Sequence, residues 1–149
     1  MELGNAAEAR AELDLVSARV RNHIRVLEIR WAIEASENDW SAAFDIARQT
    51  AQAHPKHPFG LIHQAYAMRR KADGSLQAAW DILFPAMEIF PDEYLIPYNL
   101  ACYACQMDQP DKARILLARA IALGKKHPVK QMALRDTDLK TLWPEIEAM

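Results

Sequence analysis

Residues 60–93, GLIHQAYAMRRKADGSLQAAWDILFPAMEIFPDE, and residues 94–127, YLIPYNLACYACQMDQPDKARILLARAIALGKKH, align without a gap at an offset of 34 residues. The matched positions are small or apolar: Ala67 falls on Ala101, Ala79 on Ala113, Leu83 on Leu117 and Ala86 on Ala120. Each segment has a helical apolar pattern, a short polar break and a second helical pattern. This repeat predicts pairs of helices that stack on one another.

A third, more divergent copy precedes these two segments. At an offset of 36 residues, Ala43 aligns with Ala79, Ala47 with Leu83 and Pro55 with Pro91. Upstream of its turn, residues 5–36 contain no proline or glycine, and their apolar residues recur at spacings of three and four. This pattern predicts one long amphipathic helix or two helices with a soft joint.

The spacing Ala-x3-large-x2-Ala resembles the tetratricopeptide repeat, and the small bacterial proteins with three repeats in particular. It is present as Ala79-Leu83-Ala86 and as Ala113-Leu117-Ala120, and prolines close the first two units. Lys125 replaces the closing proline of the last unit. The tail VKQMALRDTDLKTLWPEI is similar to the segment that ends many bacterial proteins of this type.

The resemblance implies an all-α fold: a tetratricopeptide-type α-solenoid of about three helix-turn-helix repeats, with an N-terminal helix and a C-terminal capping helix. We expect a single domain over residues 1–149. Its predicted parts are an N-terminal helix (1–23), a degenerate repeat (24–59), two regular repeats (60–93 and 94–127) and a C-terminal cap (128–149).

Composition narrows the function classes. The chain of 149 residues has a formal net charge of −2, so no overall basic field would attract nucleic acid or an anionic membrane. The two cysteines are too few for a disulfide framework, and the N-terminus does not resemble a secretory signal. We therefore expect a cytoplasmic protein without nucleic-acid or membrane partners.

Two groups of residues have the types that carry chemistry. Cys102 and Cys105 have the C-x-x-C spacing of thiol redox proteins, but they lie inside a predicted helix, where small packing residues are the simpler interpretation. His54, His57 and His63 cluster around a proline-containing loop and could hold zinc, although loop histidines are commonly plain surface residues. We expect no catalytic residues, no cofactor and no metal, and a redox protein is the remote alternative.

The resemblance also implies a binding surface, because the first helix of each pair lines the concave face in this family. Helix geometry then selects a mixed, mostly apolar stripe. Its residues are Leu61, Gln64, Met68 and Lys71 in one repeat, and Leu95, Tyr98, Cys102, Cys105 and Gln106 in the next. The leading hypothesis is an adaptor or scaffold that binds a peptide or helix of another protein there.

Two alternatives stay open. The architecture is similar to that of secretion-type chaperones, in which an N-terminal helix mediates dimerisation, so a homodimer or other self-associating assembly is the second hypothesis. The stripe could also be covered by the chain's own N-terminal helix or by a second copy. The sequence does not identify the partner.

The alignment makes a testable prediction about packing. Ala101 is predicted to lie where two helix backbones approach closely, so Ala101→Trp should destabilise the fold severely by overpacking. Thermal melting of the variant measures the effect. An unchanged midpoint would show that the packing register is wrong.

Overall fold

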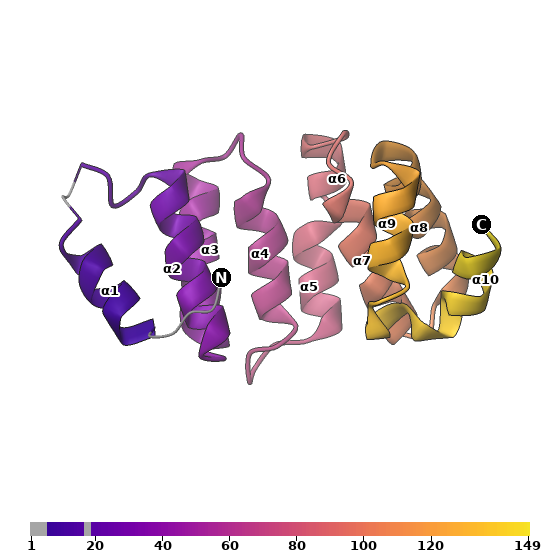
Figure 1. The fold of residues 1–149 in the computed structure, drawn as a ribbon, viewed down its shortest axis with the longest axis horizontal. Helices are drawn as coiled ribbons and strands as arrows, with labels where there is room; N and C mark the ends of the chain where they lie inside the picture. The colour runs from indigo at the N-terminus through magenta and orange to yellow at the C-terminus, as the bar shows by residue number, and fades with distance from the viewer. Residues whose placement is uncertain (1–5, 17–18) are drawn as a thin grey trace. The chain divides into compact units, whose positions relative to one another are not determined.

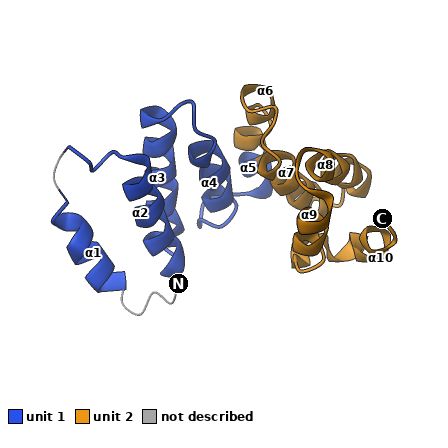
Figure 2. Ribbon diagram, turned by 45° about the horizontal axis from the view of Figure 1, so that its top comes forward, with its two compact units in different colours: residues 1–79 blue, residues 80–149 orange. Residues whose placement is uncertain are grey.

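The computed structural model describes residues 6–16 and 19–149, and every regular element in this part of the chain is a helix (Figure 1). The predicted all-α class is therefore confirmed. None of the described helices is both long and apolar enough to cross a bilayer. The chain divides into two compact units, residues 1–79 and residues 80–149 (Figure 2).

Unit 1 consists of helices joined by short connections. They are α1 (Ala6–Asp14), α2 (Ile24–Ser36), α3 (Trp40–Ala53), α4 (Phe59–Met68) and the first turn of α5 (Leu76–Leu83), which ends in unit 2. Helix α3 packs between α2 and α4 (Figure 1). The sequence predicted either one long helix or two helices upstream of residue 37, and the structure has two, α1 and α2. Arg10 on α1 reaches Glu34 at 2.6 Å and Glu37 at 2.7 Å, which ties α1 to α2.

Unit 2 contains one long helix pair and a cap of shorter helices. Its further elements are α6 (Ala86–Ile89), α7 (Leu95–Gln106), α8 (Pro110–Leu123), α9 (Lys126–Ala133), the 3-10 helix η1 (Thr137–Leu142) and α10 (Trp143–Ala148). Helices α7 and α8 form the pair, η1 packs on α7, and α9 packs on α8 and α10. The C-terminal cap consists of three short helices over residues 126–148, because Asp136 caps a new helix and Pro144 starts another.

Two tight turns, one in each unit, end a helix in the same way. Asn38 and Asp108 have positive φ angles of 60° and 57°, and the offsets of 36 and 34 residues relate one position to the other through Gly74, whose φ angle is not positive. At both turns the preceding helix ends with a hydrogen bond from an N–H to the carbonyl five residues earlier. Asp39 donates to the carbonyl of Glu34 and Gln109 to that of Ala104, each at 2.9 Å. This hydrogen bond with a left-handed residue is the Schellman motif, which ends a helix sharply.

Aligned positions on the second helices are occupied alike. Ala43, Ala79 and Ala113 are fully buried, and so are the aligned Thr50, Ala86 and Ala120. Buried small side chains let helix backbones approach closely, as the repeat pattern predicted.

Pro85 interrupts the helical run, because α5 ends at Leu83 and α6 begins at Ala86. Ser75 caps α5, with its hydroxyl accepting from the N–H of Ala78 at 3.0 Å. Helix α8 begins at Pro110, so Asp111 lies in its first turn and accepts from Arg114 at 2.6 Å.

The contact between α3 and α4 depends on a glycine. A Cβ added at Gly60 would lie 2.4 Å from the backbone nitrogen of Ala51 and 2.6 Å from its Cα. These neighbours are backbone atoms, so they cannot move aside without shifting a helix. Only glycine permits this approach of the two helices.

Gly60→Ala should therefore lower the stability, although the same change at an ordinary helical position raises it by roughly 0.5–1 kcal/mol. We expect a loss of about 1–3 kcal/mol from overpacking. Urea or thermal unfolding measures it. Ala118→Gly on the exposed side of α8 is the matched control, with an expected loss of about 1 kcal/mol from helix propensity alone. A gain in stability from Gly60→Ala would contradict the close contact.

Candidate functional site

Half-buried aromatic side chains gather on α2 and α4 in unit 1, together with one arginine. We call this group the aromatic row; its members are Trp31, Trp40, Phe59, His63, Tyr66 and Arg70. Four of them follow one another at spacings of four, three and four residues along and just beyond α4, which places them on one helix face. Trp31 comes from α2, and Trp40 is the first residue of α3.

The rings of the aromatic row are in continuous contact. The ring of Trp31 stands edge-on to those of His63, Tyr66 and Phe59, at centroid distances of 4.4, 5.8 and 6.1 Å. Phe59 and His63 are stacked at 3.8 Å with an interplanar angle of 19°. Aromatic pairs of this kind contribute roughly 0.5–1.5 kcal/mol each beyond the area that they bury. The row is therefore rigid as well as partly exposed.

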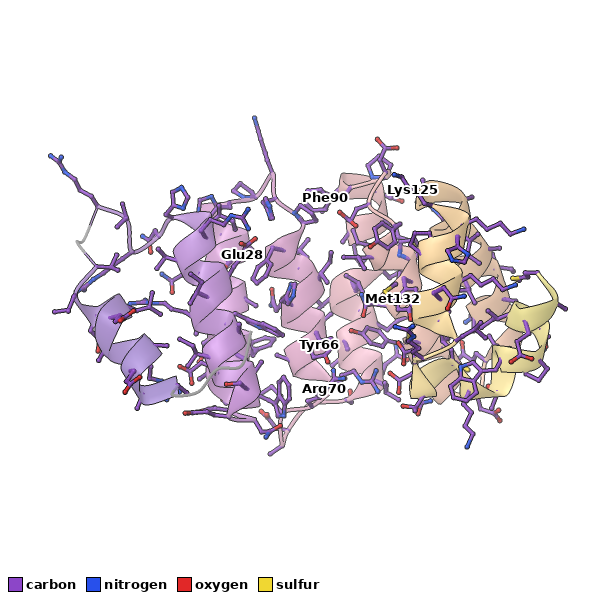
Figure 3. All side chains as sticks on the ribbon, in the orientation of Figure 1. Glu28, Tyr66, Arg70, Phe90, Lys125 and Met132 are labelled. Atoms are coloured by element: carbon purple, nitrogen blue, oxygen red, sulfur yellow. The ribbon has the colours of Figure 1, made fainter. Side chains whose placement is uncertain are left out.

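Arg70 ends the aromatic row with a positive charge. Its guanidinium carbon lies 3.6 Å from the ring centroid of Tyr66 and 5.4 Å from that of Trp40. Its Nη1 also donates to the carbonyl of Tyr66 at 3.0 Å, and Figure 3 shows the two side chains at the same end of α4. Cation–π contact and a backbone hydrogen bond hold the guanidinium in one orientation.

His63 is the titratable ring inside the aromatic row. Burial disfavours its charged form and lowers its pKa below the usual value, although a hydrogen bond between Nδ1 and the carbonyl of Phe59, at 3.0 Å, acts in the opposite direction. The ring is therefore held neutral among its aromatic neighbours near neutral pH.

The histidines that the sequence offered as a zinc site do not converge. His54 Nε2 lies 2.6 Å from the carbonyl oxygen of Asn22, and His57 Nδ1 accepts from the N–H of Phe59 at 3.2 Å. Within residues 6–16 and 19–149, no cluster of three possible metal ligands includes any of these histidines. Each imidazole instead has a local structural contact.

The predicted groove residues of the earlier repeat lie beside the aromatic row and not within it. Leu61, Gln64 and Met68 are half-buried. Lys71 is held by its own unit: its Nζ lies 3.1 Å from Asp73 and 4.9 Å from the ring centroid of Phe44, and its side chain is only 16% exposed.

The predicted groove residues of the later repeat face the chain's own C-terminal cap. Four of the five touch the segment 136–141; the contacts are Tyr98 to Asp136, Cys102 to Asp136, Cys105 to Thr141 and Gln106 to the carbonyl of Asp138. Tyr98 and Cys102 are 4% and 2% exposed, and Leu95 is half-buried. The cap therefore covers Tyr98 and Cys102, while Cys105 is half-buried and Gln106 is exposed. A partner could reach Tyr98 and Cys102 only by displacing the cap.

Asp136 fixes that cap on α7. Its Oδ2 accepts from the Tyr98 hydroxyl at 3.0 Å and from the Cys102 thiol at 3.5 Å, while its Oδ1 accepts from the N–H of Asp138. Burial, followed by the neighbouring Cys102 and Asp136, raises the pKa of Tyr98 above its usual value. Cys102, Asp136 and Asp138 are close enough to share a metal ion, and the hydrogen bonds of Asp136 join the cap to α7.

Sequence reasoning missed the aromatic row as a unit. The spacing of Phe59, His63, Tyr66 and Arg70 was the available signal. Their contacts with Trp31 and Trp40 join different helices and could not be derived from a pattern within one helix.

Comparison with known proteins gives no match to a protein-family model, to a curated protein or to a solved structure. The likeness to tetratricopeptide repeats therefore rests on the repeated residues of this chain.

The position of His63 predicts a pH dependence of stability. Because its pKa is lowered in the folded state, the unfolded chain binds this proton at a higher pH, and the free energy of unfolding should fall as the pH drops from about 7 to about 5. His63→Gln should remove part of that fall. Chemical denaturation across this pH range measures it, with the exposed His127→Gln as the control. Equal pH profiles for the wild type and His63→Gln would contradict the prediction.

Proposed function

We propose that this protein is a protein-interaction module, an adaptor or scaffold, which holds a segment of another protein on the aromatic row of unit 1. The observation that carries the proposal is the rigid contact network of half-buried aromatic rings that ends in the oriented guanidinium of Arg70. The proposal assigns the chain no catalytic activity. It takes the helix pairs as tetratricopeptide repeats, supported by the spacing of the buried alanines.

Interface energetics favour this surface. Tryptophan, tyrosine and arginine are the residues whose truncation most often weakens protein complexes by 2 kcal/mol or more. Ordering flexible side chains costs about 0.5–1.5 kcal/mol for each one immobilised. In the aromatic row the side chains are already ordered by contacts within the chain, such as the stacking of His63 on Phe59 at 3.8 Å. A partner would therefore meet a preorganised surface.

The proposal narrows the expected groove. On α7 the predicted residues Tyr98, Cys102, Cys105 and Gln106 contact the cap, so the open surface lies on the first helices of unit 1. The partner is a peptide or helix that offers apolar side chains to the rings and an acceptor group to Arg70. Self-association through the N-terminal helix stays a separate prediction; Arg10 already engages α1 with α2 inside one chain.

Removal of the central ring and the charge should abolish partner capture. In affinity purification with quantitative mass spectrometry, Tyr66→Ala/Arg70→Ala should lower the recovery of specific partners by at least about tenfold, because both are hot-spot residue types. A photoreactive phenylalanine analogue at position 66 should crosslink to the same partners.

The matched control is Phe84→Ala/Lys112→Ala, which removes one aromatic ring and one cation from unit 2 and should leave capture unchanged. Thermal melting of both variants verifies that they are folded. Equal recovery of the same partners by the two variants would overturn the assignment of the binding surface.

A further inference from the structure

The segment around α9 is positively charged, whereas the chain as a whole has a small negative net charge. Residues 125–135, KKHPVKQMALR, contain four lysines and arginines and one histidine but no acid, although the formal net charge of the protein is −2. The side chains of Lys125, Lys126, His127 and Arg135 are exposed. The described residues provide no ion pair to any of these four. The positive charge of α9 is therefore available to a partner.

Two hollows lie along the same helix. The first has a volume of about 440 Å³, and its walls include Tyr94, Leu123, Val129 and Met132. The second, of about 560 Å³, lies toward Arg135, and both hollows are lined by Pro128 and Met132. Figure 3 shows Lys125 at one end of α9 and Met132 further along it. The α9 face thus combines one mainly apolar hollow and one mainly polar hollow with cations at both ends.

The other charges at this face do not cancel these cations. Asp136 is the acid that lines the second hollow, and its carboxylate already accepts from Tyr98, Cys102 and the N–H of Asp138. At the opposite end, no side chain caps the first turn of α9, since Lys125 is the preceding residue. The positive end of the helix dipole therefore adds to the lysines.

We propose that the α9 face of unit 2 is a docking surface for an acidic peptide segment that carries apolar anchor side chains. Charge complementarity selects the acidic partner, and the apolar walls of the first hollow select the anchors. A helix of eight residues is about 12 Å long, which an extended segment of about four residues spans. The recognition motif is accordingly short.

The same observations favour a peptide over nucleic acid. Binding of single strands uses several aromatic platforms on which bases stack, whereas the two hollows contain one aromatic residue, Tyr94. Leu123, Val129 and Met132 match apolar side chains better than phosphates or bases. This surface is separate from the aromatic row and does not depend on the function proposed for it.

Selection from random displayed peptides of roughly twelve residues tests the proposal on the full chain. Enriched peptides should place aspartate or glutamate next to leucine, methionine or phenylalanine. The best peptide is then synthesised with a fluorescent label, and its affinity is measured by anisotropy. Lys125→Glu/Lys126→Glu/Arg135→Glu should weaken binding at least about tenfold, and Met132→Glu should weaken it as well.

The control Lys56→Glu/Arg119→Glu/Lys140→Glu makes the same change in net charge at exposed positions outside α9 and should keep the affinity within about threefold. Enrichment of no acidic–apolar motif would overturn the proposal, and so would an equal loss of affinity in the two triple variants. A single-stranded oligonucleotide of similar charge that binds as tightly as the best peptide would also overturn it, by showing a surface for polyanions in general.

Discussion

Close approach of helix backbones at small residues is the constraint on which the rest of unit 1 depends. At Gly60 the backbone of Ala51 already occupies the space that a Cβ would need, and Ala43 and Ala47 are fully buried on the same helix α3. Helices this close bring the flanks of α2 and α4 within reach of each other. The ring of Trp31 therefore meets those of His63 and Tyr66, and the aromatic row is a consequence of small side chains beneath it.

Unit 2 is subject to a different constraint, which is that the apolar face of its helix pair has to be covered. A helix pair leaves an apolar face uncovered, and terminal capping elements are needed to cover it. Here Leu139, Leu142 and Ile146 are buried in the cap, and Asp136 links the cap to Tyr98 and Cys102 on α7. The same contacts close the stripe that a partner would otherwise use. Stabilising the end of the fold thus restricts binding on α7.

The two proposed surfaces therefore differ in chemistry. The aromatic row presents rings and a single oriented guanidinium, so affinity there would come from burial and shape. The α9 face presents several exposed cations beside one mainly apolar hollow, so association there would respond strongly to salt. Two surfaces of unlike chemistry can hold two different segments.

The sequence by itself determined the helical class and the position of two turns. Both follow from spacings of three and four residues and from turn residues, and Asn38 and Asp108 have the same left-handed conformation. Only the tertiary structure decided which helix faces stay open. The cap reaches residues more than thirty positions away, as Asp136 does at Tyr98, and Trp31 meets His63 across helices. Helical periodicity is local, whereas the covering of a face depends on how distant segments pack, and that is why Tyr98 and Cys102 in the stripe predicted on α7 are covered.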